Sequence, residues 1–338
     1  MAPTQTPTET RQIVLASRPH GAPTDENFRL ETAALPTVQS GQILVQNEVM
    51  SVDPYMRGRM NDTKSYIPPF QIDEPLEGAA VGTVIASESD SITVGDHVLH
   101  SLGWREFAVV DDAAATVIDV EAASASKYLG ILGMPGLTAY VGLTEIAKFK
   151  KGDVVFVSGA AGAVGSAVGQ IAKALGASKV IGSAGSAEKI ARVKELGFDE
   201  AFNYKEGDVK ELLQKAAPDG VDVYYDNVGG DHLEAAIGAL RKYGRVAMCG
   251  AISQYNATKP EPGPTNLFMA VGKELNLRGF IVGNHYDLAP EFLEQAVQWL
   301  QDGTLQADET FRDGLENAPQ AFIDLLGGAN TGKMIVRL

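Results

Sequence analysis

The feature that most constrains the fold is a regular alternation of short apolar strands and amphipathic helices, which begins at Asp153. The predicted strands are 154–158, 179–183, 200–204, 221–226, 245–249 and 275–282. The predicted helices are 164–175, 186–196, 208–217, 231–240 and 290–300, with Ser186 as an N-cap and Gly197 as a stop for the second. Strands that are joined by helices pair in parallel, so this part of the chain predicts an α/β fold with a doubly wound parallel sheet.

The first hundred residues follow a different pattern. Short β-prone segments at 42–46, 79–86, 97–99 and 106–110 are separated by glycine turns, which favours a small barrel-like antiparallel unit. The segment 333–338 is again strand-like, and we expect it to return to this unit. The predicted organisation is therefore a β-rich domain over 1–130, a parallel-sheet domain over 131–303, and a return to the first domain over 304–338.

Composition excludes several classes of protein. The chain has 338 residues, 43 of them acidic and 28 basic, and its net charge of −15 disfavours binding to nucleic acid or to an anionic membrane surface. The single cysteine, Cys249, excludes an internal disulfide and a four-cysteine zinc lobe. Glycines or Met134-Pro135-Gly136 interrupt the two longest uncharged stretches, 154–172 and 128–144, and the N-terminus has no signal-peptide pattern. We therefore expect a soluble, cytoplasmic protein.

The strongest chemical signal is a glycine-rich turn, Ser158-Gly159-Ala160-Ala161-Gly162-Ala163-Val164-Gly165, between a predicted strand and a predicted helix. Gly162 would let the backbone approach a pyrophosphate, and Gly165 would let the helix pack closely against the strand. The N–H groups and the dipole of the helix N-terminus favour phosphate at this position. Ala160 replaces the usual first glycine. The alternative is a tight turn without a ligand.

The second predicted strand indicates which dinucleotide would bind. It ends in Gly182-Ser183-Ala184-Gly185-Ser186, without the acid that binds the adenosine ribose hydroxyls of NAD. No charge would therefore repel a 2′-phosphate, and Lys189 lies just beyond. This pattern favours NADP, with an ordinary exposed helix lysine as the alternative for Lys189.

Two other chemistries lack the residues that they need. The histidines are His20, His97, His100, His232 and His285, and no cysteine accompanies the first three as a zinc site of a dehydrogenase requires. We therefore predict no metal. The string from Tyr255 to Lys259 matches the Tyr-x-x-x-Lys pair of short-chain dehydrogenases, but that pair must share a helical face. Prolines at 260, 262 and 264 stop any helix there.

Six motifs together resemble one known family. They are Ser51-Val52-Asp53-Pro54-Tyr55-Met56-Arg57, Gly133-Met134-Pro135-Gly136-Leu137-Thr138-Ala139-Tyr140, the turn at 160–166, Phe202-Asn203-Tyr204-Lys205, Tyr225-Asp226-Asn227-Val228-Gly229-Gly230 and Cys249-Gly250-Ala251-Ile252-Ser253. Nearly the whole chain is similar to the zinc-independent medium-chain reductases of the leukotriene B4 dehydrogenase/prostaglandin reductase type, which include curcumin and alkenal double-bond reductases. Glu77-Gly78-Ala79 stands where the zinc enzymes carry Gly-His-Glu.

The resemblance implies a fold, a reaction and a set of site residues. It implies a GroES-like β-rich domain, a Rossmann domain and NADPH-dependent reduction of the C=C bond of α,β-unsaturated ketones and aldehydes. The implied cofactor residues are Gly162, Ala163, Val164, Gly165, Lys189, Tyr204, Asn227, Cys249, Gly250, Ala251, Ile252, Ser253, Tyr255, Phe280, Ile281, Val282 and Asn330. Lys189 and Tyr204 would contact the 2′-phosphate.

The implied mechanism gives Tyr255 a catalytic role. A hydride would add to the β-carbon of the enone, and the Tyr255 hydroxyl would stabilise the charge on the carbonyl oxygen, helped by the nicotinamide ribose hydroxyl. The alternative for Tyr255 is packing against the cofactor. Tyr55 is expected to wall the substrate pocket. Tyr66 is either part of a flexible loop over that pocket or an ordinary loop tyrosine.

Two other functions and an assembly state remain open. A quinone reductase of the same superfamily would use the same cofactor without zinc, and a non-catalytic NADPH-binding protein would keep the same motifs. The predicted strand 275–282 would lie at the sheet edge, and exposed edges are usually paired or covered. The resemblance suggests a homodimer.

Overall fold

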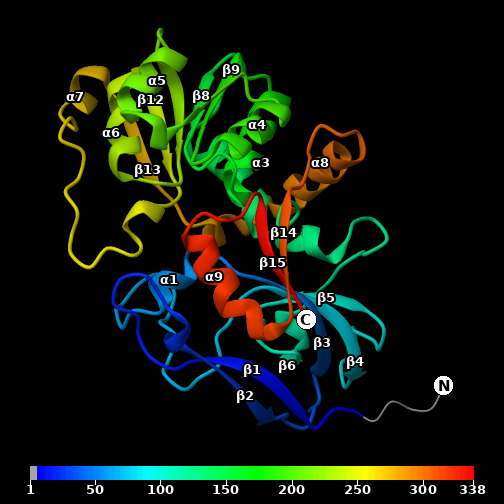
Figure 1. Cartoon of the computed structure of the whole chain (residues 1–338). Helices are drawn as coiled ribbons and strands as arrows, with labels where there is room; N and C mark the ends of the chain where they lie inside the picture. Colours follow the sequence, from blue (N-terminus) through cyan, green and yellow to red (C-terminus); the bar gives the residue numbers. More distant parts are fainter. Residues whose placement is uncertain (1–5) are drawn as a thin grey trace. The chain divides into compact units, whose positions relative to one another are not determined.

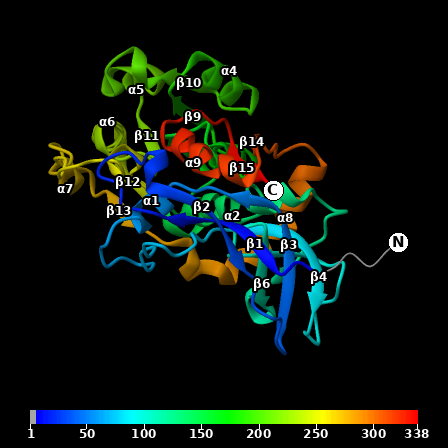
Figure 2. The same ribbon diagram turned by 60° about the horizontal axis from the view of Figure 1, so that its bottom comes forward.

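The computed structural model describes residues 6–338, which form two compact units (Figures 1 and 2). One unit contains the chain up to Leu129 together with Glu309–Asn330 and Met334–Leu338, and the other contains Gly130–Asp308 and Thr331–Lys333. The chain therefore leaves the second unit after Asp308 and contributes a short segment to it again near the C-terminus. Within the described residues, no helix has the length and hydropathy that a membrane span requires.

The first unit is built on antiparallel strands. Its strands are β1 (Glu9–Leu15), β2 (Phe28–Ala34), β3 (Gln42–Ser51), β4 (Ala80–Ser87), β5 (His97–His100), β6 (Phe107–Asp111), β7 (Thr116–Val117), β14 (Glu309–Asp313) and β15 (Lys333–Arg337). The main sheet has the order β14-β15-β3-β4-β5-β7, β6 also pairs with β3, and β1 and β2 form a separate hairpin. The β-rich character predicted for this part of the chain is confirmed, and the late strand β15 pairs with β3.

An aromatic cluster closes the core of this unit. The rings of Phe28 and Trp104 stack with 6.1 Å between their centroids, and Phe322 lies edge-on to both. Phe322 comes from α9 (Ala318–Leu326), so the late helix packs on a core that the first hundred residues began. Burial of such large apolar side chains is the main stabilising contribution to this unit.

The second unit is a six-stranded parallel sheet covered by helices. Its strands are β8 (Val154–Val157), β9 (Lys179–Ala184), β10 (Glu200–Asn203), β11 (Val221–Asp226), β12 (Leu240–Met248) and β13 (Asn276–Gly279), in the order β10-β9-β8-β11-β12-β13. Its helices are α2 (Met134–Val141), α3 (Ala163–Ala174), α4 (Ala187–Glu195), α5 (Val209–Ala216), α6 (Gly230–Ala239), α7 (Met269–Lys273) and α8 (Ala289–Gln301). Helices α3 and α4 lie on one face of the sheet and α5 and α6 on the other (Figure 1). This arrangement follows because the right-handed connections run from β8 towards β10 in the first half and from β11 towards β13 in the second. The predicted doubly wound sheet is confirmed.

Some predicted boundaries are wrong. The strand predicted over 275–282 ends at Gly279. It pairs with β12, and the last residue of β12, Met248, lies opposite Gly279. Strand β12 begins at Leu240, which was assigned to the preceding helix, because Leu240 pairs with Val221 before an irregularity in the ladder. The strand predicted to reach Tyr204 ends at Asn203, and a 3-10 turn over Tyr204–Glu206 follows.

Candidate functional site

The order of the strands singles out one place on the sheet for a ligand. Strands β8 and β11 are neighbours, although the chain runs out to β9 and β10 between them, so the direction of winding reverses at this pair. The loops that follow the two strands therefore separate at the carboxyl edge. Open parallel sheets bind ligands at such a switch point.

The glycine turn follows β8 at this edge. Gly162 is the N-cap of α3, and a Cβ placed on it would meet only the Gly159 carbonyl oxygen, at an ordinary 3.4 Å. A Cβ on Gly165 would lie 2.3 Å from the same oxygen, so the first turn of α3 packs directly on the loop backbone. The side of Gly162 is thus open to a ligand, whereas Gly165 has no room for a side chain. The first N–H groups of α3 have no acceptor within the helix, which suits an anion.

A short late segment of the chain holds the other side of the turn. The Gly332 N–H donates to the Ala161 carbonyl at 2.7 Å, and Gly332 and Gly162 form an isolated parallel bridge. Gly332 has a φ of +66° and lies so close to Asp308 that a Cβ would sit 1.9 Å from its carbonyl oxygen. Only glycine fits at position 332. Asn330, just upstream, is buried in the first unit.

A buried polar network joins the turn to the loop after β11. The Ser158 hydroxyl accepts a hydrogen bond from the Asn227 N–H at 3.0 Å, and the Asn227 side chain donates to the Ser158 carbonyl at 2.8 Å. The Asp226 carboxylate accepts from the Tyr224 hydroxyl at 2.7 Å and from the N–H groups of Val228 and Gly229. Burial raises the pKa of Asp226, while these donors lower it. Asp226 is therefore a structural acceptor that shapes the loop.

The loop after β12 lies beside the loop after β11. The N–H groups of Cys249 and Gly250 both donate to the Asp226 carbonyl, at 2.9 and 3.0 Å. Ser253 is tied to the Val228 carbonyl through both its N–H and its hydroxyl. Burial raises the pKa of the Cys249 thiol to about 12, so this cysteine is a neutral packing residue at neutral pH.

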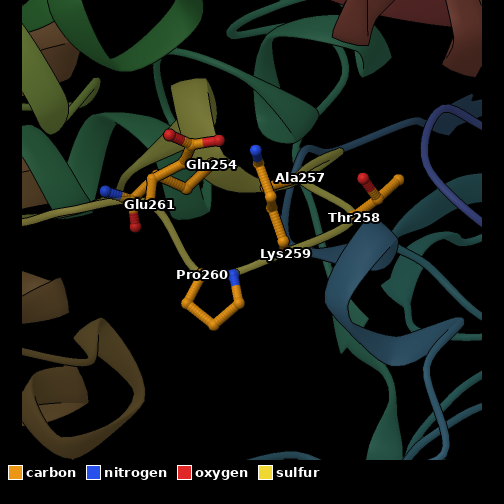
Figure 3. Close-up of a pocket in the computed structure, with 6 residues that line it drawn as sticks. All are labelled: Gln254, Ala257, Thr258, Lys259, Pro260 and Glu261. Carbon is orange, nitrogen blue, oxygen red and sulfur yellow. The ribbon is translucent and has the colours of Figure 1, made fainter.

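Tyr255 follows the 3-10 turn Ile252–Gln254 of this loop. Its hydroxyl accepts a long hydrogen bond of 3.4 Å from the Ala251 N–H and lies 3.0 Å from where a Gly250 Cβ would stand. Beyond Tyr255, a hollow of about 370 Å³ runs along the loop, lined by Gln254, Ala257, Thr258, Lys259, Pro260 and Glu261. Figure 3 shows the Lys259 side chain extending away from the Pro260 ring.

Cationic and aromatic side chains gather beyond β9 and β10. Lys189 lies in the first turn of α4, where its N–H donates to the Ser186 hydroxyl at 3.3 Å and confirms the predicted N-cap. A Cβ on Gly185 would lie 2.9 Å from the Tyr204 hydroxyl and 3.2 Å from Cε of Lys205. Burial, and then the charge of Lys205, lower the pKa of Lys189. Two ammonium groups in mutual repulsion beside a phenol suit a dianion such as a phosphate monoester.

The sequence did not single out two residues of this cluster. Lys205 follows Tyr204 in the motif 202–205, and this position beside a predicted cofactor residue could have identified it. His232, from α6, packs edge-on against the Tyr204 ring at 5.2 Å. Its Nε2 is buried without a hydrogen-bond partner, and burial lowers the pKa of His232 to about 4. No local pattern in the sequence predicts the contact between His232 and Tyr204.

The remaining predicted residues lie elsewhere. Phe280, directly after β13, packs edge-on against Tyr225 at 6.4 Å, with Ile281 and Val282 next along the chain. Tyr55 precedes α1 (Met56–Arg59) in the first unit and packs against its core. Tyr66, also in the first unit, is 63% exposed in the loop after α1.

No group of three or more histidine, cysteine, aspartate or glutamate side chains with the geometry to hold a metal ion occurs in residues 6–338.

A parallel sheet with a glycine turn at its switch point, joined to a β-rich unit, defines the class of two-domain dinucleotide-binding oxidoreductases. Comparison with known proteins agrees. Residues 11–118 match the model described as the N-terminal domain of oxidoreductase, and residues 163–302 match that of zinc-binding dehydrogenases. The chain is 42% identical to the NADPH-dependent curcumin reductase of Escherichia coli over 97% of this chain and 96% of the relative. It is 40% identical to the NADP-dependent 2-alkenal reductase of Nicotiana tabacum over 96% of each.

A solved structure gives the same result. The chain is similar to CurA of Vibrio vulnificus in complex with NADPH, with a TM-score of 0.92 and 44% identity over 97% of this chain and 98% of that one. The chain belongs to the leukotriene B4 dehydrogenase/prostaglandin reductase family of medium-chain reductases, as its motifs predicted.

Proposed function

We propose that the protein is an NADPH-dependent reductase of the carbon–carbon double bond of α,β-unsaturated ketones and aldehydes. The observation that carries the cofactor choice is the cluster of Lys189, Tyr204 and Lys205, next to a strand end without an acid. The double-bond chemistry is supported by the relatives, which are named as reductases of curcumin and of 2-alkenals.

The residues present fit the cofactor. The open side of Gly162 and the N-terminus of α3 would hold the pyrophosphate, and the lysine cluster would hold the 2′-phosphate. Asn227, the loop 249–255, residues 280–282 and Asn330 would line the rest of the cofactor. When bound, NADPH supplies the hydride that reduces the substrate.

Tyr255 would act on the substrate oxygen. Negative charge develops on the carbonyl oxygen when the β-carbon is reduced, and a positioned hydroxyl donor stabilises that charge. The loop that carries Tyr255 is anchored through backbone hydrogen bonds to Asp226 and Val228, which supports a fixed position for the phenol. The Tyr255 hydroxyl accepts a long hydrogen bond from the Ala251 N–H of the same loop. No metal takes part in this proposal.

Tyr55 and Tyr66 are proposed to contribute to the substrate pocket from the first unit.

We also propose that two copies associate through the edge strand β13, because exposed apolar side chains at Leu267, Phe268 and Val271 lie in the segment that leads into it. Light scattering that gives the mass of a monomer would exclude the dimer. A cytoplasmic location completes the proposal, and cell fractionation tests it.

The deciding experiment follows NADPH oxidation by absorbance, with a medium-chain enone and with a quinone as substrates. We expect turnover of the enone and formation of the saturated ketone. In Tyr255→Phe we expect kcat to fall about a hundredfold, the usual contribution of one such donor, with the NADPH dissociation constant unchanged. Unchanged turnover would reduce Tyr255 to a packing residue. Turnover of the quinone alone would assign a quinone reductase, and NADPH binding without any turnover would assign a non-catalytic protein.

A further inference from the structure

Helix α4 carries Lys189 but has little core packing of its own. Among its nine residues, Ala187–Glu195, only Val193 is buried. A short helix in water is marginal unless tertiary contacts hold it. The position of Lys189 therefore depends on whatever else fixes the helix to the rest of its unit.

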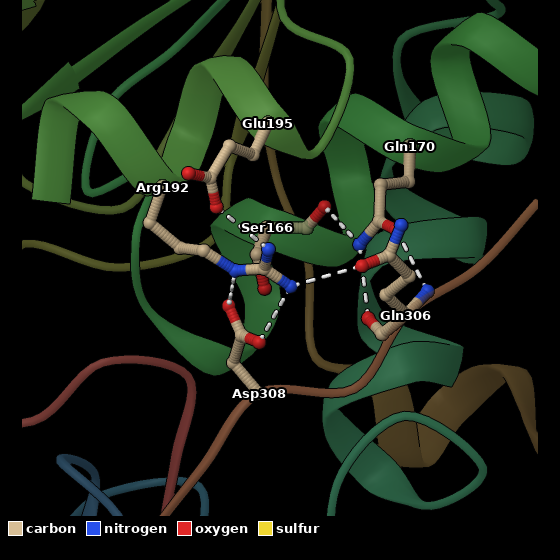
Figure 4. A network of polar contacts seen from close by, with 6 residues as sticks. All are labelled: Ser166, Gln170, Arg192, Glu195, Gln306 and Asp308. Carbon is tan, nitrogen blue, oxygen red and sulfur yellow. Dashed lines mark hydrogen bonds and ion pairs between the residues drawn. The ribbon is translucent and has the colours of Figure 1, made fainter.

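Arg192, one turn after Lys189, provides such a contact. Its Nε and Nη2 bind the two oxygens of the Asp308 carboxylate at 2.8 and 2.9 Å, which is the bidentate geometry (Figure 4). Nη2 also donates to the Gln306 side chain at 3.0 Å, and Nη1 pairs with Glu195 at 2.9 Å. Arg192 and Asp308 are mostly buried, whereas Glu195 is exposed. The rigid fork of the guanidinium fixes both the distance and the angle between α4 and the segment 306–308.

The segment 306–308 is in turn fixed to the glycine turn and to α3. The Asp308 carbonyl accepts from the Lys333 N–H at 2.8 Å, and the neighbouring Gly332 donates to Ala161 in the turn. Gln306 exchanges two hydrogen bonds with the Gln170 side chain of α3, at 2.8 and 3.1 Å. A continuous series of charged and backbone contacts thus connects Arg192, in the last turn of α4, to Ala161 in the glycine turn before α3.

We propose that the Arg192–Asp308 ion pair is a positioning device that sets α4 relative to the glycine turn and so determines the preference for a 2′-phosphorylated dinucleotide. The inference rests on the proposed function, in which the turn holds the pyrophosphate and Lys189 the 2′-phosphate. Because the two phosphate groups belong to one molecule, both elements must be placed correctly at once. NADH has no 2′-phosphate, so its binding does not depend on where α4 carries Lys189.

The test compares Asp308→Asn with Glu195→Gln, a matched control that removes the other, exposed partner of Arg192. Dissociation constants for NADPH and NADH are measured by fluorescence titration, and Tm is recorded for each variant. We expect Asp308→Asn to weaken NADPH about tenfold, the cost of one misplaced charged hydrogen bond, and to leave NADH within about twofold. Glu195→Gln should leave both constants unchanged. At saturating NADPH, kcat should stay within about twofold, because the pair is remote from the reacting atoms.

A purely structural role would give a different result. Equal weakening of NADPH and NADH, or a lower Tm with both constants unchanged, would overturn the proposal. If Asp308→Asn does not fold, Arg192→Gln carries the same expectation. The variant Lys189→Ala distinguishes failure of the proposed 2′-phosphate site from failure of the proposed positioning role. An unchanged NADPH/NADH ratio in that variant would refute the 2′-phosphate site itself, whereas a changed ratio there with none in Asp308→Asn would refute only the positioning role.

Discussion

Gly162 and Gly165 lie three residues apart in the glycine turn, and substitution by alanine is predicted to affect the two positions differently. At Gly165 the new methyl would stand 2.3 Å from the Gly159 carbonyl oxygen and 2.8 Å from its carbon. Ordinary contact begins at 3.4 Å, so α3 or the loop must move by about 1.1 Å (3.4 − 2.3). Backbone displacement of this kind costs about 1–3 kcal/mol. For a unit of this size we expect Tm to fall by about 3–10 °C.

At Gly162 the same methyl causes no clash within the protein. It would meet only the Gly159 oxygen, at 3.4 Å, and would otherwise occupy the open space over the turn. Alanine is a poorer N-cap than glycine by about 0.5 kcal/mol, and the reduced freedom of the unfolded chain offsets a similar amount. We therefore expect Tm within about 2 °C of wild type and NADPH binding at least tenfold weaker, about 1.4 kcal/mol.

The assay needs only thermal unfolding by circular dichroism and NADPH titration by fluorescence. Gly272→Ala is a suitable control, because nothing lies within 4 Å of its new methyl, and it should leave both Tm and affinity intact or raise Tm slightly. Wild-type NADPH affinity in a stable Gly162→Ala protein would refute the assignment of this space to the pyrophosphate. An unchanged Tm in Gly165→Ala would refute the close-packing explanation.

Three further predictions follow from the charges described above. Lys189→Ala and Lys205→Ala should each lower the NADPH/NADH preference about tenfold or more, measured as the ratio of dissociation constants, with NADH itself unaffected. Burial lowers the pKa of His100 and His232 to about 4, so both stay neutral in the fold while the unfolded chain takes up protons below about pH 6.5. The stability that each contributes is present above pH 6.5 and lost towards pH 4, about 3 kcal/mol apiece, so Tm should fall steeply over that window. In His232→Phe this fall should be shallower, and an equally steep fall would show that other groups cause it.

The sequence was sufficient for the features that depend on local pattern. The strand–turn–helix around Gly162 was predicted with nearly correct bounds, because apolar periodicity, a glycine turn and an N-cap all operate within a few residues. The absence of an acid after β9 was also visible directly. These signals predicted the parallel sheet and the glycine turn at which the pyrophosphate would bind.

Features that depend on pairing across the chain were missed. Strands β1 and β2 have no strong alternation, and each is a strand because the other pairs with it and because Phe28 packs against Trp104 and Phe322. The strand predicted to end at Tyr204 ends one residue earlier, at Asn203. The approach of Lys205 to Lys189, and of His232 to Tyr204, joins residues on separate elements, so neither contact could be predicted from spacing.

The bond between Gly332 and Ala161 has a consequence for how the chain is made. The two residues are 171 positions apart (332 − 161). At about 5–20 residues per second, the ribosome delivers the donor about 10–30 s after the acceptor. Near the end of that interval the nascent chain has its glycine turn and most of both sheets, but it still lacks the segment that fixes the turn and the strand β15 that lies between β14 and β3. A premature stop near codon 330 should therefore leave a polypeptide with almost all of its mass and none of its dinucleotide affinity.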